Sequence, residues 1–176
     1  NVNNPDPADR HITVQVSDDS SASSNIAAST IHVVPQNDPP TLDLDDDNSG
    51  GINAGNVRVQ YTENAVATPL NSIIVTSDLD DTNYESATVV HTNPQPGDQI
   101  SVNGVIVSDG SSGTVAGIAY IVTTNVTGQL VISFSGTATL AAYKVALESV
   151  SFANSSDNPA TVQRDITFQI NDGLDN

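Results

Sequence analysis

The sequence predicts an all-β fold, an antiparallel β-sandwich that carries one short helix. Short stretches alternate apolar and polar residues, and Gly, Pro, Asn and Asp separate them at the spacing typical of sandwich strands. Thr, Val, Ile and Ser are abundant, whereas Lys and Arg are nearly missing, so the composition favours strands over helices. Two segments far apart in the chain also resemble each other, which indicates tandem copies of one domain.

The predicted elements follow from this alternation in chain order. We expect strands over residues 10–16, 25–34, 57–61, 73–75, 87–90, 100–102, 118–122, 130–134, 150–152 and 164–170. One segment has helical spacing instead, because Leu140, Tyr143 and Leu147 share one stripe. Thr139 is suited to cap its N-terminus, so we predict a short helix laid across the sandwich.

The charge balance limits the classes of partner. The chain of 176 residues has 4 Lys and Arg against 21 Asp and Glu, a net charge of −17. Such a surface repels nucleic acids and anionic membranes. Cysteine is absent, which excludes disulfides, thiolate metal sites and a cysteine nucleophile. No apolar run is long enough to span a bilayer and no signal peptide opens the chain, so we expect a mature or excised segment without membrane insertion.

The two ends of the chain repeat each other at an offset of 154 residues. The identical pairs are Asn4/Asn158, Pro5/Pro159, Arg10/Arg164, Ile12/Ile166, Thr13/Thr167, Gln15/Gln169 and Asp18/Asp172. A period of this length is one whole domain. We therefore assign residues 1–38 to the terminal strands of a preceding repeat, or to donor strands, and residues 39–176 to a sandwich repeat that lacks its last strand.

The boundary between these two parts is a proline-containing acidic segment, residues 35–40, called the joint below. Pro39 and Pro40 remove backbone donors, so the preceding strand cannot continue through them. Acidic residues lie at Asp38 within this joint and at several positions just after the prolines. A hard divalent ion such as Ca²⁺, which takes six to eight oxygen ligands, is the natural partner of such a segment.

The whole chain resembles the long cadherin-like, immunoglobulin-like sandwich repeats of very large bacterial surface adhesins, including those exported with RTX tails. The matching segments are residues 37–45, 61–64, 77–80, 140–147, 150–154, 156–159 and 171–173. The resemblance implies an extracellular module on the bacterial cell surface, rigidified by calcium and repeated many times to extend an adhesive tip. Residues 163–165 (QRD) are the nearest approach to the Asp-Arg-Glu motif of animal cadherins, so cadherin ion sites do not transfer position by position.

Three loops could converge at one pole of the sandwich to bind Ca²⁺. Asp78 and Asp80 can face the same side of an extended turn, and Glu63, Asp38 and Asn37 are the candidates to complete the shell. The alternative is that these acids are exposed turn residues that keep the protein in solution.

Three further acids are weaker candidates for the same ion. Asp172 and its repeat mate Asp18 each follow a strand, which fits a ligand or an Asx-turn. Asp45 and Asp47 belong to an acidic run before a flexible loop and also offer ligand oxygens. The predicted metal ligands are thus Asn37, Asp38, Asp45, Asp47, Glu63, Asp78, Asp80 and Asp172.

These features predict a structural role and no enzymatic one. His11, His32 and His91 lie apart along strands, and no nucleophile elbow or phosphate-binding glycine loop is present. Our first hypothesis is a calcium-rigidified tandem repeat of an extracellular adhesin or surface fibre, whose partners are calcium and neighbouring copies. The alternative is a filament subunit assembled by β-strand donation between copies. A weaker alternative, a carbohydrate-binding module, is disfavoured by the shortage of aromatic residues.

Overall fold

The computed structural model describes residues 5–50, 52, 55–71 and 73–174. Its elements are β1 (Arg10–Val14), β2 (Ala27–Ile31), β3 (Thr41–Asp43), β4 (Thr68–Pro69), β5 (Val75–Ser77), β6 (Asn83–His91), β7 (Asp98–Val102), β8 (Val105–Val107), β9 (Ser112–Val115), β10 (Ile118–Thr124), β11 (Leu130–Thr139), α1 (Leu140–Glu148), β12 (Val150–Asn154) and β13 (Ile166–Asn171). The predicted fold class is confirmed, because the described chain is an all-β sandwich of antiparallel sheets with a single short helix.

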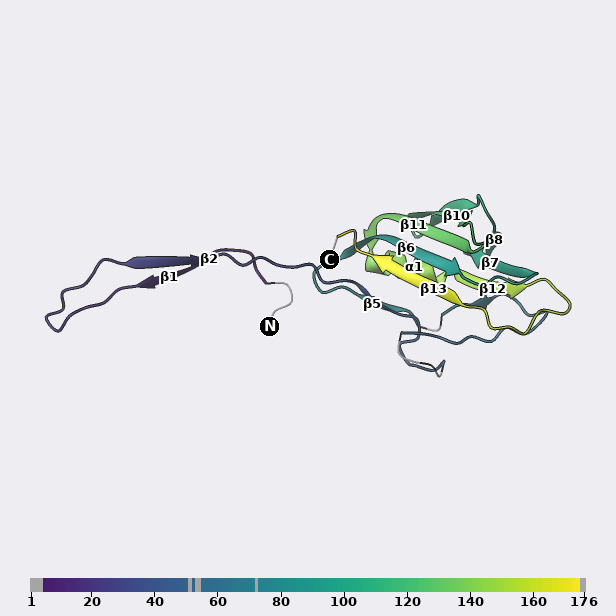
Figure 1. Ribbon diagram of the computed structural model, residues 1–176, viewed down its shortest axis with the longest axis horizontal. Coiled ribbons are helices and arrows are strands. Elements are labelled where there is room, and N and C mark those ends of the chain that lie inside the picture. The colour runs from purple at the N-terminus through teal and green to yellow at the C-terminus, as the bar shows by residue number, and fades with distance from the viewer. Residues whose placement is uncertain (1–4, 51, 53–54, 72, 175–176) are drawn as a thin grey trace.

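Two larger sheets form the body of the sandwich. One has the order β13-β6-β11-β10-β9, and the other has the order β4-β12-β7-β8. β3 and β5 form a separate two-stranded sheet next to the joint. In Figure 1, β13 is the outermost arrow of its sheet, beside β6.

The two larger sheets share one hydrophobic core. Alternate residues of β6 and β11, such as Val89 and Ile132, point inward and meet Ile100 of β7 and Val150 of β12. This period of two is the expected pattern for strands with one buried face. The core therefore joins strands that are distant in the sequence into one unit.

The predicted helix is confirmed as α1, and Thr139 caps it by accepting a hydrogen bond from the N–H of Ala142. Tyr143 is fully buried, and its ring packs edge-on against Tyr84 at a centroid distance of 5.9 Å. The Tyr143 hydroxyl donates to the carbonyl of Gly136, which lies at a bulge in β11 with φ of 122°. Glycine adopts this backbone conformation without strain, so the bulge and the helix are fixed together.

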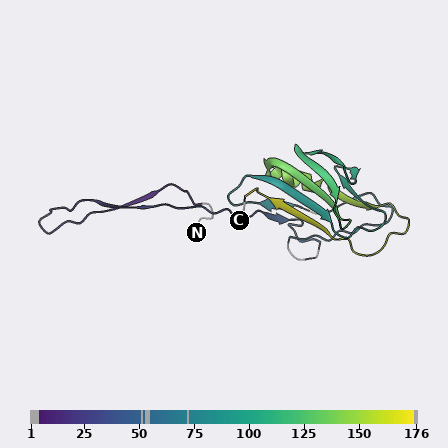
Figure 2. The ribbon, with the colours of Figure 1, turned by 45° about the horizontal axis from the view of Figure 1, so that its top comes forward.

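The first two strands form a hairpin outside the sandwich. β1 and β2 pair in antiparallel register from Arg10↔Ile31 to Val14↔Ala27. All ten residues of these strands are exposed. Figures 1 and 2 show this hairpin extending away from the sandwich along the long axis of the molecule. The assignment of residues 1–38 to a preceding repeat stays a prediction.

One predicted strand is absent from the structure, and the strand predicted over residues 73–75 overlaps β5 only at Val75. Residues 57–61 alternate in sequence, but they form no ladder in the structure. Val57 and Tyr61 are partly buried against the core, but Val59 between them is 37% exposed, so the alternating pattern here corresponds to no paired strand. The short strands β3, β4, β8 and β9 were not predicted, because none is longer than four residues and so none shows much alternation of its own.

Candidate metal centre

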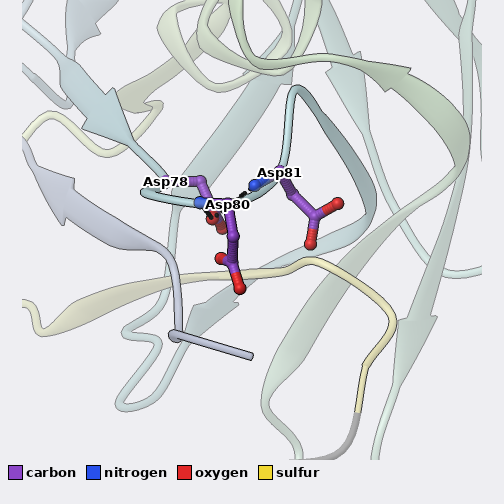
Figure 3. Close-up of side chains that lie close together, drawn as sticks. All are labelled: Asp78, Asp80 and Asp81. Atoms are coloured by element: carbon purple, nitrogen blue, oxygen red, sulfur yellow. Dashed lines mark hydrogen bonds between the residues drawn. The ribbon is translucent and has the colours of Figure 1, made fainter. Parts of the chain in front are cut away.

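The turn after β5 gathers three carboxylates. Asp78 Oδ1 accepts hydrogen bonds from the N–H groups of Asp80 (3.1 Å) and Asp81 (3.0 Å). This Asx-turn folds the chain back on itself before β6 begins. One carboxylate oxygen from each of Asp78, Asp80 and Asp81 lies within 4.8 Å of the other two. Figure 3 shows these side chains projecting from the single turn.

The joint and the end of β13 meet this turn. The N–H of Asp38 donates to Asp80 Oδ2 (3.1 Å), and Asn37 Nδ2 donates to Asp172 Oδ2 (2.9 Å). Three segments distant in the sequence are therefore brought to one pole of the sandwich, where the chain leaves toward the hairpin (Figure 1). This end of the sandwich, called the acidic pole below, brings together five of the predicted ligands, namely Asn37, Asp38, Asp78, Asp80 and Asp172.

Two carboxylate oxygens at this pole lack a donor. Asp78 Oδ2 and Asp80 Oδ1 are shielded from solvent, and neither has a hydrogen-bond partner among the residues that the structure describes. A buried carboxylate oxygen without a donor is costly, since it loses its hydration without replacement. A divalent cation between such oxygens would satisfy them, and oxygen donors are the ligands that Ca²⁺ prefers.

The electrostatics of the pole show mutual repulsion. Burial raises the pKa of Asp80, and the charges of Asp78 and Asp38 raise it further, against the opposing hydrogen bond from the N–H of Asp38. Burial also raises the pKa of the Tyr84 hydroxyl, and the charges of Asp78 and Asp172 add to this effect. Because the charges of Asp78 and Asp172 both raise the pKa of the buried Tyr84 hydroxyl, Tyr84 lies beneath the acidic pole. A bound cation would relieve this repulsion.

Asp45 and Asp47 lie in a separate loop that supplies its own donors. Asp45 is fully buried, and its carboxylate accepts hydrogen bonds from the Ser49 hydroxyl (3.1 Å) and the N–H of Gly50 (2.6 Å). Hydrogen bonds from Ser49 lower the pKa of Asp47. A Cβ at Gly50 would lie 2.8 Å from Asp45 Oδ2, so the loop requires glycine there. This loop is stabilised by its own hydrogen bonds, and its acids are not part of the grouped carboxylates at the Asp78 turn.

Glu63 is not brought to the acidic pole. It follows Tyr61 by two residues, and the Tyr61 hydroxyl donates to the carbonyl of Asn154 (3.0 Å). Asn154 pairs with Asp98 at the His91 end of β6, whereas the Asp78 turn leads into the opposite end. β6 has nine residues, so its ends are separated by roughly 26 Å at about 3.3 Å per residue. The predicted role of Glu63 in the same ion shell is therefore corrected.

The opposite pole holds a buried ion pair that the sequence did not suggest. Asp98 is 2% exposed, and the Arg164 guanidinium donates to it from Nε (3.0 Å to Oδ2) and Nη2 (3.0 Å to Oδ1). Asn154 Nδ2 adds a third donor at 2.8 Å. Although burial acts to raise it, these hydrogen bonds lower the pKa of Asp98. The pair ties the segment before β13 to the first residue of β7.

His91 lies against this ion pair without a good hydrogen bond. Its Nε2 is 3.5 Å from Asp98 Oδ2, and the side chain is 3% exposed. Burial lowers the pKa of His91, an effect larger than the opposing attraction of Asp98. The residue is thus neutral near pH 7, and its ring packs edge-on against Phe152 at 6.1 Å. Its position indicates a packing role.

Sequence reasoning passed over two residues of these poles. Asp81 belongs to the grouped carboxylates, and only its place in the run after Asp78 could have indicated this. Arg164 was noted as a repeated residue, since Arg10 matches it at the offset of 154, but its buried partner could not be found from spacing alone.

Comparison with protein-family models, with curated proteins and with solved structures gave no match to this chain. Within the described residues, no helix has both the length and the apolar character needed to cross a bilayer.

Proposed function

We propose that this chain is a structural, calcium-rigidified repeat of an extracellular bacterial adhesin or surface fibre. The observation that carries the proposal is the convergence of the joint, the Asp78 turn and the end of β13 at one pole. Asp78 Oδ2 and Asp80 Oδ1 are buried there without a donor among the described residues, which supports a cation between them. The sequence resemblance to adhesin repeats supports the location on the bacterial surface.

The mechanism follows from the position of the acids. Asp38 belongs to the joint and Asp80 belongs to the sandwich, and the N–H of Asp38 donates a hydrogen bond of 3.1 Å to Asp80 Oδ2 across the boundary. Without a cation, carboxylate repulsion opposes this contact. Bound calcium would cancel the repulsion and coordinate oxygens from both parts. The hairpin would then be held in one direction relative to the sandwich, as a tension-bearing fibre requires.

Calcium is expected to raise the melting temperature of the chain. At a free concentration 100 times the dissociation constant, binding to the folded state alone contributes about 2.7 kcal/mol. For a chain of this size that is an increase of about 5–10 °C. Thermal melting followed by circular dichroism, in EDTA and then in stepwise added calcium, measures the effect. An unchanged melting temperature at millimolar calcium would contradict the proposal.

Asp80→Asn provides the sharper test, because its effect changes sign with calcium. In EDTA the substitution removes a repelled carboxylate, so the variant should melt at or above the temperature of the unsubstituted chain. In calcium it removes a ligand, so the stabilisation by the ion should be lost. Asp157→Asn is the matched control, since Asp157 is exposed and lies outside the acidic pole. A variant that keeps the full calcium response would show that Asp80 is not a ligand.

Strand donation between copies is the second candidate function. It is favoured by the hairpin, whose ten strand residues are exposed, and by the position of β13 at the edge of its sheet. Mass measurement of the native material separates the candidates. Chains of about the present length that form ladders of oligomers support a donated strand, whereas one very long polypeptide supports covalent tandem repeats.

A further inference from the structure

β1 and β13 match at the offset of 154 residues in their local hydrogen bonds as well as in sequence, and their matching residues are called twins below. Arg10 and Arg164 each donate from Nη1 to the backbone carbonyls two and four residues before them. Asp18 and Asp172 each accept the N–H of the residue two positions later. The contacts before and after each strand therefore recur at the same offset of 154. A strand that pairs with the edge of β1 should therefore also be able to pair with the matching edge of β13.

The two strands differ in their partners. β1 pairs with β2, whereas β13 pairs with β6 and ends its sheet, with no strand on its other side among the described residues. Half of the backbone N–H and C=O groups of an edge strand point away from the sheet. Applying the offset to the β1–β2 register gives the missing pairs Arg164↔Ile31, Ile166↔Ser29 and Phe168↔Ala27.

Strand β13 has no protective residue of its own along its free edge. Edge strands generally avoid further pairing by means of Lys, Pro, inward charges or bulges. β13 reads ITFQIN, with no charged residue and no proline, and its register with β6 is uninterrupted. The backbone groups along this edge are therefore free to pair with another strand.

A groove follows the same edge. It has a volume of about 330 Å³ and is lined on one side by the last residues of β13 and the residue after it, and on the other by the joint and β3. The lining residues are Phe168, Gln169, Ile170, Asn171, Asp172, Pro39, Pro40 and Leu42. A groove beside a strand suits an extended segment with small side chains. β2 reads AASTI, and its Ala27 and Ser29 would lie opposite the large Phe168 and Ile166.

We propose that the free edge of β13 binds a β2 strand from a second copy of this repeat, antiparallel and in the register given above. The occupant is a strand of this chain, because β1 already shows which strand pairs with this sequence. Successive copies would then be joined by a shared ladder. This inference rests on the repeat role of the proposed function, but it is independent of the calcium site.

The test extends the chain by its own hairpin partner. Position 176 corresponds to position 22, so a copy of residues 23–34 fused after Asn176 places a second β2 strand beside β13. The matched control carries Ala28→Pro and Ser29→Pro in the added copy, which break the ladder whichever residue donates. We expect the first fusion to melt about 5 °C or more above the control. Backbone amides of β13 that face the groove should exchange at least tenfold more slowly.

A free peptide of residues 23–34 tests binding between separate molecules. Added to the full chain in EDTA, it should slow exchange of the same β13 amides in a saturable manner, and the doubly proline-substituted peptide should not. Equal melting temperatures and equal exchange for the two fusions would overturn the proposal. Protection that falls on another strand, such as β9, would also overturn it. With the two fusions also measured in EDTA, these outcomes are separate from success or failure of the calcium proposal.

Discussion

The hairpin strand β1 and the sandwich strand β13 have related sequences and very different surroundings. Ile12, Val14 and Val16 are 51%, 58% and 66% exposed. Their counterparts in β13 are half-buried or buried, and Ile170, which matches Val16, is 8% exposed. The alternating pattern thus sets the strand and its inward face, but burial requires the rest of a sandwich. A two-stranded hairpin alone is marginally stable, so the hairpin needs a partner to hold its shape.

The comparison of twin residues predicts unequal effects of equal substitutions. The arginine pair should show the largest difference. Arg164→Ala removes the guanidinium from Asp98, which is 2% exposed, and leaves a buried carboxylate without its cation. Breaking a buried ion pair in this way costs about 3–5 kcal/mol. Arg10→Ala removes an exposed side chain, so we expect a change within about 0.5 kcal/mol in urea unfolding of the sandwich.

A rescue variant separates charge from lost packing. Asp98→Asn in the Arg164→Ala background removes the buried carboxylate that has lost its cation, so part of the lost stability should return. If Arg10→Ala and Arg164→Ala destabilise the sandwich equally, the contrast between the twins is wrong.

The apolar twins should show the next largest difference. Ile170→Ala creates space beside the core and is expected to lower the free energy of unfolding by about 2–4 kcal/mol. Val16→Ala acts on a side chain in water and should change it by less than about 0.5 kcal/mol. Urea unfolding followed by tyrosine fluorescence measures both. A comparable loss for Val16→Ala would mean that the hairpin is packed against a second molecule in solution.

The fold was largely predictable from sequence because its signals are local. Helical spacing and a cap residue identify α1 without knowledge of its neighbours, and alternation identifies strands such as β10 and β11. Pairing is not local, and this limits the prediction. Residues 57–61 alternate as a strand does, yet no ladder forms there, because an alternating pattern does not specify which backbone segment lies beside it.

The candidate site was predictable to the extent that short spacing determines it. Asp78 and Asp80 share one turn, and the strand-end position of Asp172 and the joint position of Asp38 limited where they could lie. Glu63 has the same kind of strand-end context, but it lies near the other end of the sandwich. Which pole a loop joins depends on topology, and no residue near Glu63 encodes it.

The aspartate twins offer the smallest and most specific contrast, through pH. Burial acts to raise the pKa of Asp172, but the hydrogen bonds from Asn37 and the N–H of Leu174 outweigh it and lower the pKa from 3.8. A carboxyl whose pKa is lowered by folding stabilises the fold above its ordinary pKa, and this contribution is lost as the pH falls through the folded value. In EDTA, Asp172→Asn should therefore cost about 1 kcal/mol at neutral pH and progressively less between about pH 5 and about pH 2. Asp18→Asn, on an exposed turn of the hairpin, should stay within about 0.5 kcal/mol throughout. Urea unfolding at each pH measures the free energy of unfolding of both chains. If its dependence on pH is the same for Asp172→Asn and the unsubstituted chain, Asn37 does not hold the joint to β13 through this carboxylate.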